Sequence, residues 1–224
     1  MKAVKLQKSS FRLHLSLAVR YVPMGMTSFL SQISVVASMA AVQNMTMKYG
    51  ALDPTFGQEG LTQIPMAVLG IVMKFFQIVI AFAVGFSAGC IPVVGYNIGA
   101  GRKDRAKKLF KMLLGAELAT GLVALAIVEG LPGQLIRLFG AAGESAYYTE
   151  FAVRCFRVYL CMLPLATINK GTFIYLQALG KAALSSGISL VREIVFGCGL
   201  PILLPVFFGL NGVLYSMPVA DALM

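Results

Sequence analysis

The segment Ile64–Lys111, IPMAVLGIVMKFFQIVIAFAVGFSAGCIPVVGYNIGAGRKDRAKKLFK, decides the fold. It begins with a long apolar run that a single charge, Lys74, interrupts, and it closes on a Gly-rich corner with many Lys and Arg residues. A helix of about 20 apolar residues crosses the roughly 30 Å hydrocarbon core of a bilayer. The segment therefore predicts a long or tilted membrane-spanning helix. Its basic end is expected in the cytoplasm, where Lys and Arg are retained during insertion.

The composition of the whole chain is typical of an integral membrane protein. Of its 224 residues, 58% are hydrophobic and only 12% are charged, whereas about a quarter of the residues in soluble domains are charged. The formal net charge is +10, and the basic residues lie in short segments between apolar runs. We expect these segments to contact anionic membrane lipid or only to set the topology, and we expect no nucleic acid partner.

The apolar runs divide the chain into a basic cytoplasmic arm, residues 1–12, and one all-α membrane bundle, residues 13–224. At roughly 30 to 35 residues for each span and its loop, the bundle has room for about six helices. Residues 46–63, which are rich in Gly and acidic side chains, are expected to form an exposed outer loop. The expected spans are 15–45, the apolar part of 64–111, 109–128, 151–179 with a bend at Pro164, 185–208, and 211–224, which is too short to cross.

The distribution of Lys and Arg predicts the orientation of this bundle. The arm, the corner after the second span and Lys181 together carry about eleven basic residues, against two, Lys48 and Arg137, in the opposite loops. Such a bias predicts a multi-pass protein of the cell membrane whose amino terminus is cytoplasmic. Within the first span, Thr27, Ser31, Ser34 and Ser38 recur on one helix face, which is expected to pack on a neighbour or to line a polar cavity.

Several segments of the chain resemble one family in the same order. PVVGYNIGAGR (Pro92–Arg102), followed by a basic helix start, resembles the second helix and next cytoplasmic corner in a lobe of the multidrug and toxic compound extrusion (MATE) transporters. The similarity to the last three helices of the carboxy-terminal lobe rests on Leu163 with Pro164, YLQALGKA (Tyr175–Ala182), Val191–Glu193, Pro201, GLNGV (Gly209–Val213) and PVAD (Pro218–Asp221). The ordered series covers nearly the whole chain and is more specific than any one piece.

The resemblance implies a six-helix half of a twelve-helix secondary transporter, whose two lobes alternate between outward and inward access around a V-shaped cavity. Such transporters export organic cations and other amphipathic compounds in exchange for protons or sodium ions, without a further cofactor. The expected partners are small drug-like substrates, membrane lipid and the amino-terminal lobe. Because that lobe is absent here and the last helix is short, we expect a fragment of a longer protein rather than a half that assembles with a separate partner.

Polar and aromatic side chains on the spans are the candidate substrate-binding residues. A charge at membrane depth costs about 3 kcal/mol on insertion scales and should face protein or water. Lys74, and Gln77 three residues later on the same helix face, are therefore expected to line the cavity or to contact another helix. Gln32 in the first span, and Asn169 and Lys170 in the fourth, have the same two interpretations. The apolar candidates are Met24, Phe29 and Phe82.

The acidic residues indicate where a coupling ion binds. In one branch of the family, carboxylates on the first and fourth helices of this lobe bind the cation, but neither span has an acid inside its apolar part here. The coupling site is therefore expected in the missing lobe, and Glu117 is the proton-coupling candidate of this half. Arg192 and Glu193 are adjacent, about 100° apart on an α-helix, and should pair poorly. Arg192 is expected to form a structural ion pair with a neighbouring helix instead.

Alternative functions would require features that can be looked for in the sequence. A lipid-linked oligosaccharide flippase of the same superfamily should carry more charge in a larger cavity, and an inactive truncated fragment would expose to lipid the face meant for its partner lobe. An enzyme is not expected, because the chain has no HExxH and no close pair of aspartates. A metal site is not expected either, since His14 is the only histidine and lacks Glu or Cys at ligand spacing.

Overall fold

The computed structural model describes residues 15–58, 60–140 and 145–224, and every regular element in these ranges is helical. The basic arm expected over residues 1–12 lies outside the described residues. The elements are α1 (Leu15–Ala51), α2 (Ile64–Gly99), α3 (Lys103–Gly130), α4 (Pro132–Leu138), α5 (Ala146–Tyr159), α6 (Leu163–Ala178), α7 (Ala182–Leu190), the π-helical segment Val191–Phe196, α8 (Gly199–Phe208) and α9 (Leu210–Ala222).

The described helices confirm an all-α membrane bundle. Three of them are long and apolar enough to cross a membrane, namely α2, α3 and the continuous stretch Ala183–Phe208. The pair α5 and α6, bent by 47°, makes a fourth span if it is counted as one. Helix α1 has 37 residues, more than the roughly 20 that a crossing needs, whereas α9 has only 13. The helical segments thus follow the order that the apolar runs predict.

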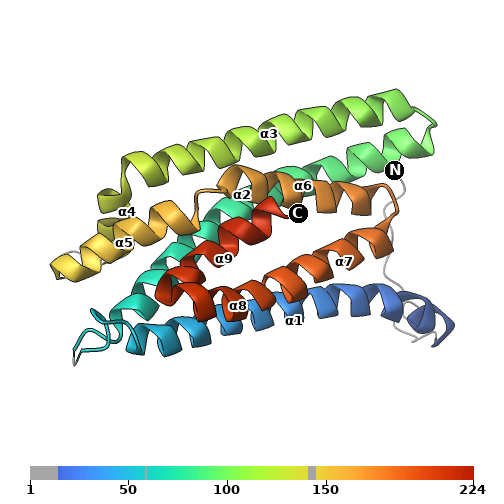
Figure 1. Cartoon of the computed structure of the whole chain (residues 1–224). Coiled ribbons are helices and arrows are strands. Elements are labelled where there is room, and N and C mark those ends of the chain that lie inside the picture. Colours follow the sequence, from blue (N-terminus) through green and yellow to red (C-terminus); the bar gives the residue numbers. More distant parts are fainter. Residues whose placement is uncertain (1–14, 59, 141–144) are drawn as a thin grey trace, which may run out of the picture.

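Two groups of helices surround a central one. Helix α3 packs along α2 and α6 on one side, while α1 packs along α7, the π-helical segment and α8 on the other. Helix α9 lies between these groups, contacts α5, α8 and α1, and brings the carboxy terminus into the middle of the bundle (Figure 1). Asp221, near the end of α9, is therefore buried among the helices, whereas Leu223 after it is 58% exposed.

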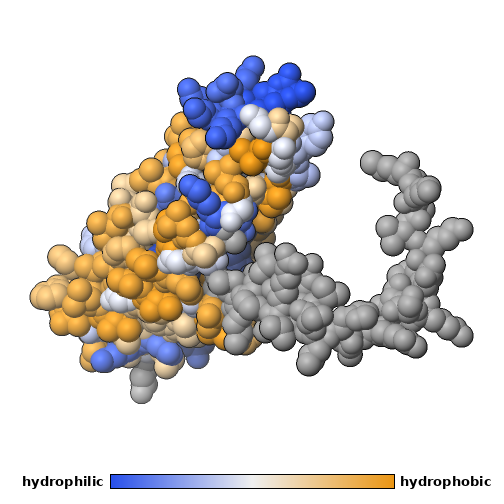
Figure 2. Space-filling view, turned by 90° about the vertical axis from the view of Figure 1, so that its right-hand side faces the viewer, coloured by the Kyte–Doolittle hydropathy of each residue, from blue (hydrophilic) through white to orange (hydrophobic). Residues whose placement is uncertain are grey.

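The start of α1, the α2–α3 corner and the α6–α7 turn lie at the same end of the bundle (Figure 1). Hydrophilic residues gather where α2 joins α3, above a mostly hydrophobic side surface (Figure 2). The chain reverses here because Gly101 adopts a positive φ of 72°, and the Arg102 N–H donates to the Asn97 carbonyl at 2.8 Å. The exposed basic residues of this corner are Arg102, Lys103, Arg105, Lys107, Lys108 and Lys111.

The loop after α1 begins later than the expectation for residues 46–63. Helix α1 continues to Ala51, and the loop packs Phe56 edge-on against Phe151 of α5, with ring centroids 4.8 Å apart. Asp53 starts the turn, since its Oδ1 accepts the Thr55 N–H at 2.9 Å. Most of the described loop residues after Ala51 are exposed, as expected, whereas Phe56 is buried at 7% exposure and anchors the loop to the core.

Candidate functional site

A cavity of about 420 Å³ lies inside the bundle, between α1, α2, α6, α9 and the π-helical segment. Its apolar wall includes Val35, Met39, Val42, Met73, Phe76, Ile80, Val84, Phe173, Phe196 and Met217. Its polar lining consists of Ser38, Gln77, Tyr159, Lys170, Arg192, Glu193 and Ser216. Sites for small organic molecules combine a volume of roughly 300–1,000 Å³ with apolar walls and a few convergent polar groups. The cavity has these properties and is the candidate site.

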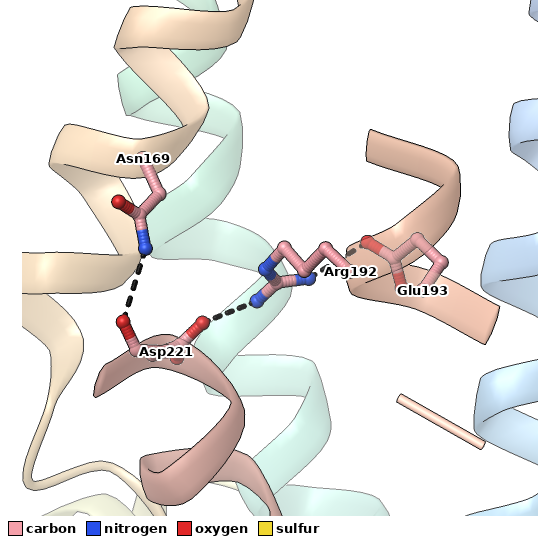
Figure 3. A network of polar contacts seen from close by, with 4 residues as sticks. All are labelled: Asn169, Arg192, Glu193 and Asp221. Carbon is pink, nitrogen blue, oxygen red and sulfur yellow. Dashed lines mark hydrogen bonds and ion pairs between the residues drawn. The ribbon is translucent and has the colours of Figure 1, made fainter. Parts of the chain in front are cut away.

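One arginine joins two buried carboxylates at the border of this cavity (Figure 3). Arg192 Nη1 donates to Glu193 Oε1 at 2.7 Å, and Arg192 Nη2 donates to Asp221 Oδ1 of α9 at 2.5 Å. The carboxylates are almost enclosed, since Glu193 is 8% and Asp221 is 3% exposed. Asn169 of α6 donates through Nδ2 to the Asp221 backbone oxygen at 3.1 Å. These contacts tie α6, the π-helical segment and α9 together.

The pairing of Arg192 with its neighbour Glu193 contradicts the expectation from their spacing. That expectation assumed an α-helix, but the segment Val191–Phe196 is π-helical, and the Gly197 N–H donates to the Arg192 carbonyl five residues back at 2.8 Å. A π-helical turn contains more residues than an α-helical turn, so successive side chains are separated by a smaller angle. The long arginine side chain then reaches its neighbour and the facing Asp221 at once.

Ser38 of α1 lies against this turn and lines the cavity, close to the position that a Cβ on Gly197 would occupy. Ser34, one helical turn earlier, is buried and donates to the Leu30 carbonyl at 2.8 Å. The hydroxyl face of α1 therefore combines the two predicted roles, close packing and cavity lining. The side chains of Thr27 and Ser31 are outside the described part of the chain.

Glu117 lies in a second polar cluster, away from the cavity, between α2, α3 and α6. Its side chain is 0% exposed, and its Oε1 accepts a hydrogen bond from the Ser87 hydroxyl at 2.7 Å. Its Oε2 is buried without a hydrogen-bond partner among the described residues, and an unsatisfied buried oxygen costs about 1–3 kcal/mol. Thr167 of α6 donates to the Glu117 backbone oxygen at 2.9 Å. The carboxyl thus lies where α3 packs against α6.

The structure brings two of the eight predicted substrate-binding residues to the cavity, Gln77 and Lys170. Gln77 is exposed on α2, with its Nε2 3.9 Å from the Met39 sulfur. Asn169 points instead to the Asp221 backbone, and Lys74 is exposed on the α2 face that also carries Gln77. Gln32 and Phe29 are exposed on α1 and do not line the cavity. The side chain of Met24, in α1, lies outside the described residues.

Phe82 lines a different hollow, on the outer side of α2 and α3. This groove, of about 480 Å³, is bounded by apolar side chains of both helices, and Phe82 is 62% exposed beside it. Its lining contains one polar side chain, Thr120. The groove therefore lacks the convergent polar groups that distinguish the inner cavity.

The site also includes Glu193, Asp221 and Tyr159, which the expectations from the sequence did not contain. Asp221 stands near the end of α9, where the short apolar run gave no sign of a buried partner, and Tyr159 ends α5 just before the bend. One signal was available, since an Arg inside an apolar run requires an acidic partner at the same depth. No group of three His, Cys, Asp or Glu side chains in the described ranges is arranged to hold a metal ion.

Comparisons with known proteins agree on the family of this fold. The MatE family model matches residues 23–203. A MOP superfamily transporter from Pyrococcus furiosus, described as having a binding pocket of reverse polarity, is similar with a TM-score of 0.81 at 16% identity. A MATE protein in complex with MaL6 has a TM-score of 0.82 at 17% identity. An outward-facing multidrug resistance MATE transporter has a TM-score of 0.80 at 17% identity. A search of curated proteins finds no match.

Each of these structures matches over 98% of this chain but over only 47% of its own length. The chain thus spans about half the length of the solved structures that it matches. At these identities the structures establish the fold, and the family model, which covers most of the chain, establishes the family. The chain belongs to the MatE family of membrane transporters.

Proposed function

We propose that the chain forms one lobe of a secondary active transporter that exports amphipathic, drug-like compounds. The observation that carries this proposal is the cavity inside the bundle, because its volume, apolar wall and few polar groups suit a small organic ligand. The similarity to inward-facing and outward-facing transporters supports a mechanism of alternating access. In such a mechanism, rigid helix bundles rock around a binding site near the membrane midplane.

The partner of this lobe in the proposal is a second helical lobe, with this chain in the carboxy-terminal position. The solved relatives have about twice the length of the chain, which leaves room for such a lobe. Large apolar side chains on α2, including Ile78, Phe82 and Phe86, are exposed in the chain by itself. Membrane lipid or the other lobe would cover them, since water contact with a large apolar patch is unfavourable.

We place this transporter in the cell membrane with the α2–α3 corner on the cytoplasmic side. The exposed Lys and Arg residues of the corner lie at the same end of the bundle as the start of α1 and the α6–α7 turn, which contains Lys181 (Figure 1). Basic residues next to membrane spans favour the cytoplasmic side. The amino terminus is then cytoplasmic as well.

Export in this proposal is driven by exchange against protons or sodium ions, and Glu117 is the candidate for the proton in this lobe. A carboxyl at this depth, with one oxygen free of hydrogen bonds, changes its local interactions when a proton binds. Its position between α2, α3 and α6 would transmit that change to the packing of three helices. A coupling site in the other lobe is compatible with this arrangement.

Glu117→Gln is expected to remove most of the export driven by a pH gradient, because the amide keeps the volume and an acceptor for Ser87 but cannot exchange a proton. The measurement is drug extrusion from vesicles after a pH jump, in a complete transporter that contains this lobe. Glu129→Gln is the matched control, since Glu129 is an exposed acid on the same helix. Unchanged gradient-driven export in Glu117→Gln would exclude this residue from coupling.

Gln77→Ala tests the proposed substrate cavity. Loss of one hydrogen bond of about 1 kcal/mol to a bound compound should weaken the apparent affinity for substrate roughly fivefold. Membrane abundance should not change, because Gln77 makes only a long contact to a methionine sulfur. The measurement is the concentration dependence of fluorescent-drug export, with Gln177→Ala, an exposed glutamine at the end of α6, as the control. Equal affinity in both variants would place substrate elsewhere.

A further inference from the structure

The charged side chains around the inner cavity differ in whether they form ion pairs within the protein. Arg192 and Glu193 line the cavity, and Asp221 lies directly behind them on α9. Both carboxylates accept hydrogen bonds from the one guanidinium, at 2.7 Å and 2.5 Å. Both acidic side chains of the site are therefore hydrogen-bonded to Arg192, and neither is free to bind a positively charged ligand.

Lys170 presents the opposite situation in the same cavity. It is half-buried on α6 and lines the cavity, yet no carboxylate oxygen among the described residues lies within ion-pair distance of its ammonium group. A lysine at membrane depth is costly unless it faces a counter-charge or water. The nearest acidic side chain of the lining, Glu193, already accepts from Arg192. Among the described residues Lys170 thus has no ion pair, and the charge of Glu193 acts on its ammonium only from beyond ion-pair distance.

The two helices that complete the wall add no negative charge. Helices α1 and α2 contain no Asp or Glu between Leu15 and Ala51 or between Ile64 and Gly99. Helix α2 instead carries Lys74, which is exposed three residues before Gln77 and does not itself line the cavity. Lys74 likewise has no carboxylate within ion-pair distance among the described residues. At the cavity the formal charges of Arg192, Lys170, Glu193 and Asp221 balance, and Lys170 is the one of these side chains without an ion pair among the described residues.

The apolar side chains of the wall indicate which kind of ligand body fits the cavity. Phe76, Phe173 and Phe196 provide flat apolar surfaces, and Met39, Met73 and Met217 provide flexible ones that adapt to different shapes. We propose that this cavity binds amphipathic organic anions, with the apolar body against the Phe and Met side chains and the acidic head group at Lys170. This inference rests on the proposed function and names its substrate class, in place of the organic cations that the resemblance implied.

The test compares two probes that share a fluorophore and a linker but differ in charge. Dansyl-aminohexanoate carries a carboxylate, and dansylcadaverine carries an ammonium group. The full 224-residue chain is reconstituted in phosphatidylcholine nanodiscs, and binding is followed by the rise in dansyl emission at physiological salt. We expect the anion to bind about tenfold more tightly, because a charge-assisted hydrogen bond to lysine favours only that probe.

Variants assign this preference to one side chain. Lys170→Gln should weaken anion binding about tenfold and leave the two probes equal, and Lys170→Glu should reverse the preference. Lys108→Gln removes the same charge from the exposed basic corner and should change neither affinity. Lys74→Gln, at an exposed position outside the cavity lining, is a second control and should also change neither affinity. Size-exclusion profiles identical to wild type show that each variant is folded.

Three results would overturn the inference: equal or tighter binding of dansylcadaverine by the wild-type chain, no binding of either probe, or an anion preference that survives in folded Lys170→Gln. The proposed transport function fails separately. Anion binding without export by the complete transporter would contradict the transport proposal and support the inference. Export with a preference for cations would do the reverse.

Discussion

Arg192→Leu is expected to lower the free energy of unfolding by about 3–5 kcal/mol, because removal of one partner from a buried ion pair leaves the other charge uncompensated. Here a single guanidinium serves two carboxylates, Glu193 and Asp221, and the Arg192 side chain is only 14% exposed. Its loss would leave two acids facing each other inside the bundle. The measurement is unfolding in mixed detergent micelles, followed by circular dichroism.

Replacement of all three charges separates this effect from a loss of packing. The variant with Arg192→Leu, Glu193→Gln and Asp221→Asn contains no unpaired charge and should recover most of the lost stability. Arg192→Lys should recover little, since an ammonium group lacks the planar fork that bonds to two carboxylates at once. If the triple variant is as unstable as Arg192→Leu, the network does not act through charge compensation, and the side-chain volume of Arg192 explains the result.

Gly121→Val should destabilise the bundle by about 3 kcal/mol through overpacking at the contact between α3 and α6. A Cβ at Gly121 would lie 2.7 Å from Thr167 Oγ1 and 2.9 Å from the Pro164 nitrogen. The second of these atoms is backbone at the start of α6, and it cannot move away without shifting that helix. The displaced Thr167 would also lose its hydrogen bond to the Glu117 carbonyl.

Gly115→Val on the same helix is the matched control for this prediction. A Cβ at Gly115 meets nothing within 4 Å, so the substitution has the same intrinsic effect on helix propensity and no clash. Thermal unfolding of the two purified variants in detergent gives the comparison. Equal stability of the two would mean that the α3–α6 contact opens at little cost, which would contradict the close packing described here.

The order and type of the helices could be predicted from the sequence because bilayer thickness constrains each apolar run. The run from Ile64 to Gly99 appears as one helix, and Leu163–Ala178 begins with Pro164 in its first turn, where a missing N–H is harmless. The bend falls just before this proline, at residues 160–162. The buried Phe56 could not be predicted, because no pattern in a Gly-rich loop indicates which side chain a distant helix will accept.

The candidate site was predicted less completely than the fold. Gln77 and Lys170 are polar residues inside apolar runs, and this signal alone led to the cavity. Asn169 carries the same signal but bonds to the α9 backbone, since adjacent residues on a helix face different neighbours. Glu193 and Asp221 required knowledge of the π-helical turn and of which helix lies opposite, and both depend on tertiary packing. Periodicity in one segment does not contain this information.

The contact between adjacent residues in the π-helical segment has a consequence for synthesis. Arg192 leaves the ribosome 29 residues before Asp221, so its partner on α9 has not yet reached the membrane when the Arg192 helix does. Glu193 emerges immediately after it and can neutralise the guanidinium on its own. Insertion of an isolated arginine is costly, and a counter-charge within the same nascent segment reduces that cost. The local pair thus allows the fifth span to enter the bilayer first, and α9 completes the network when translation delivers it.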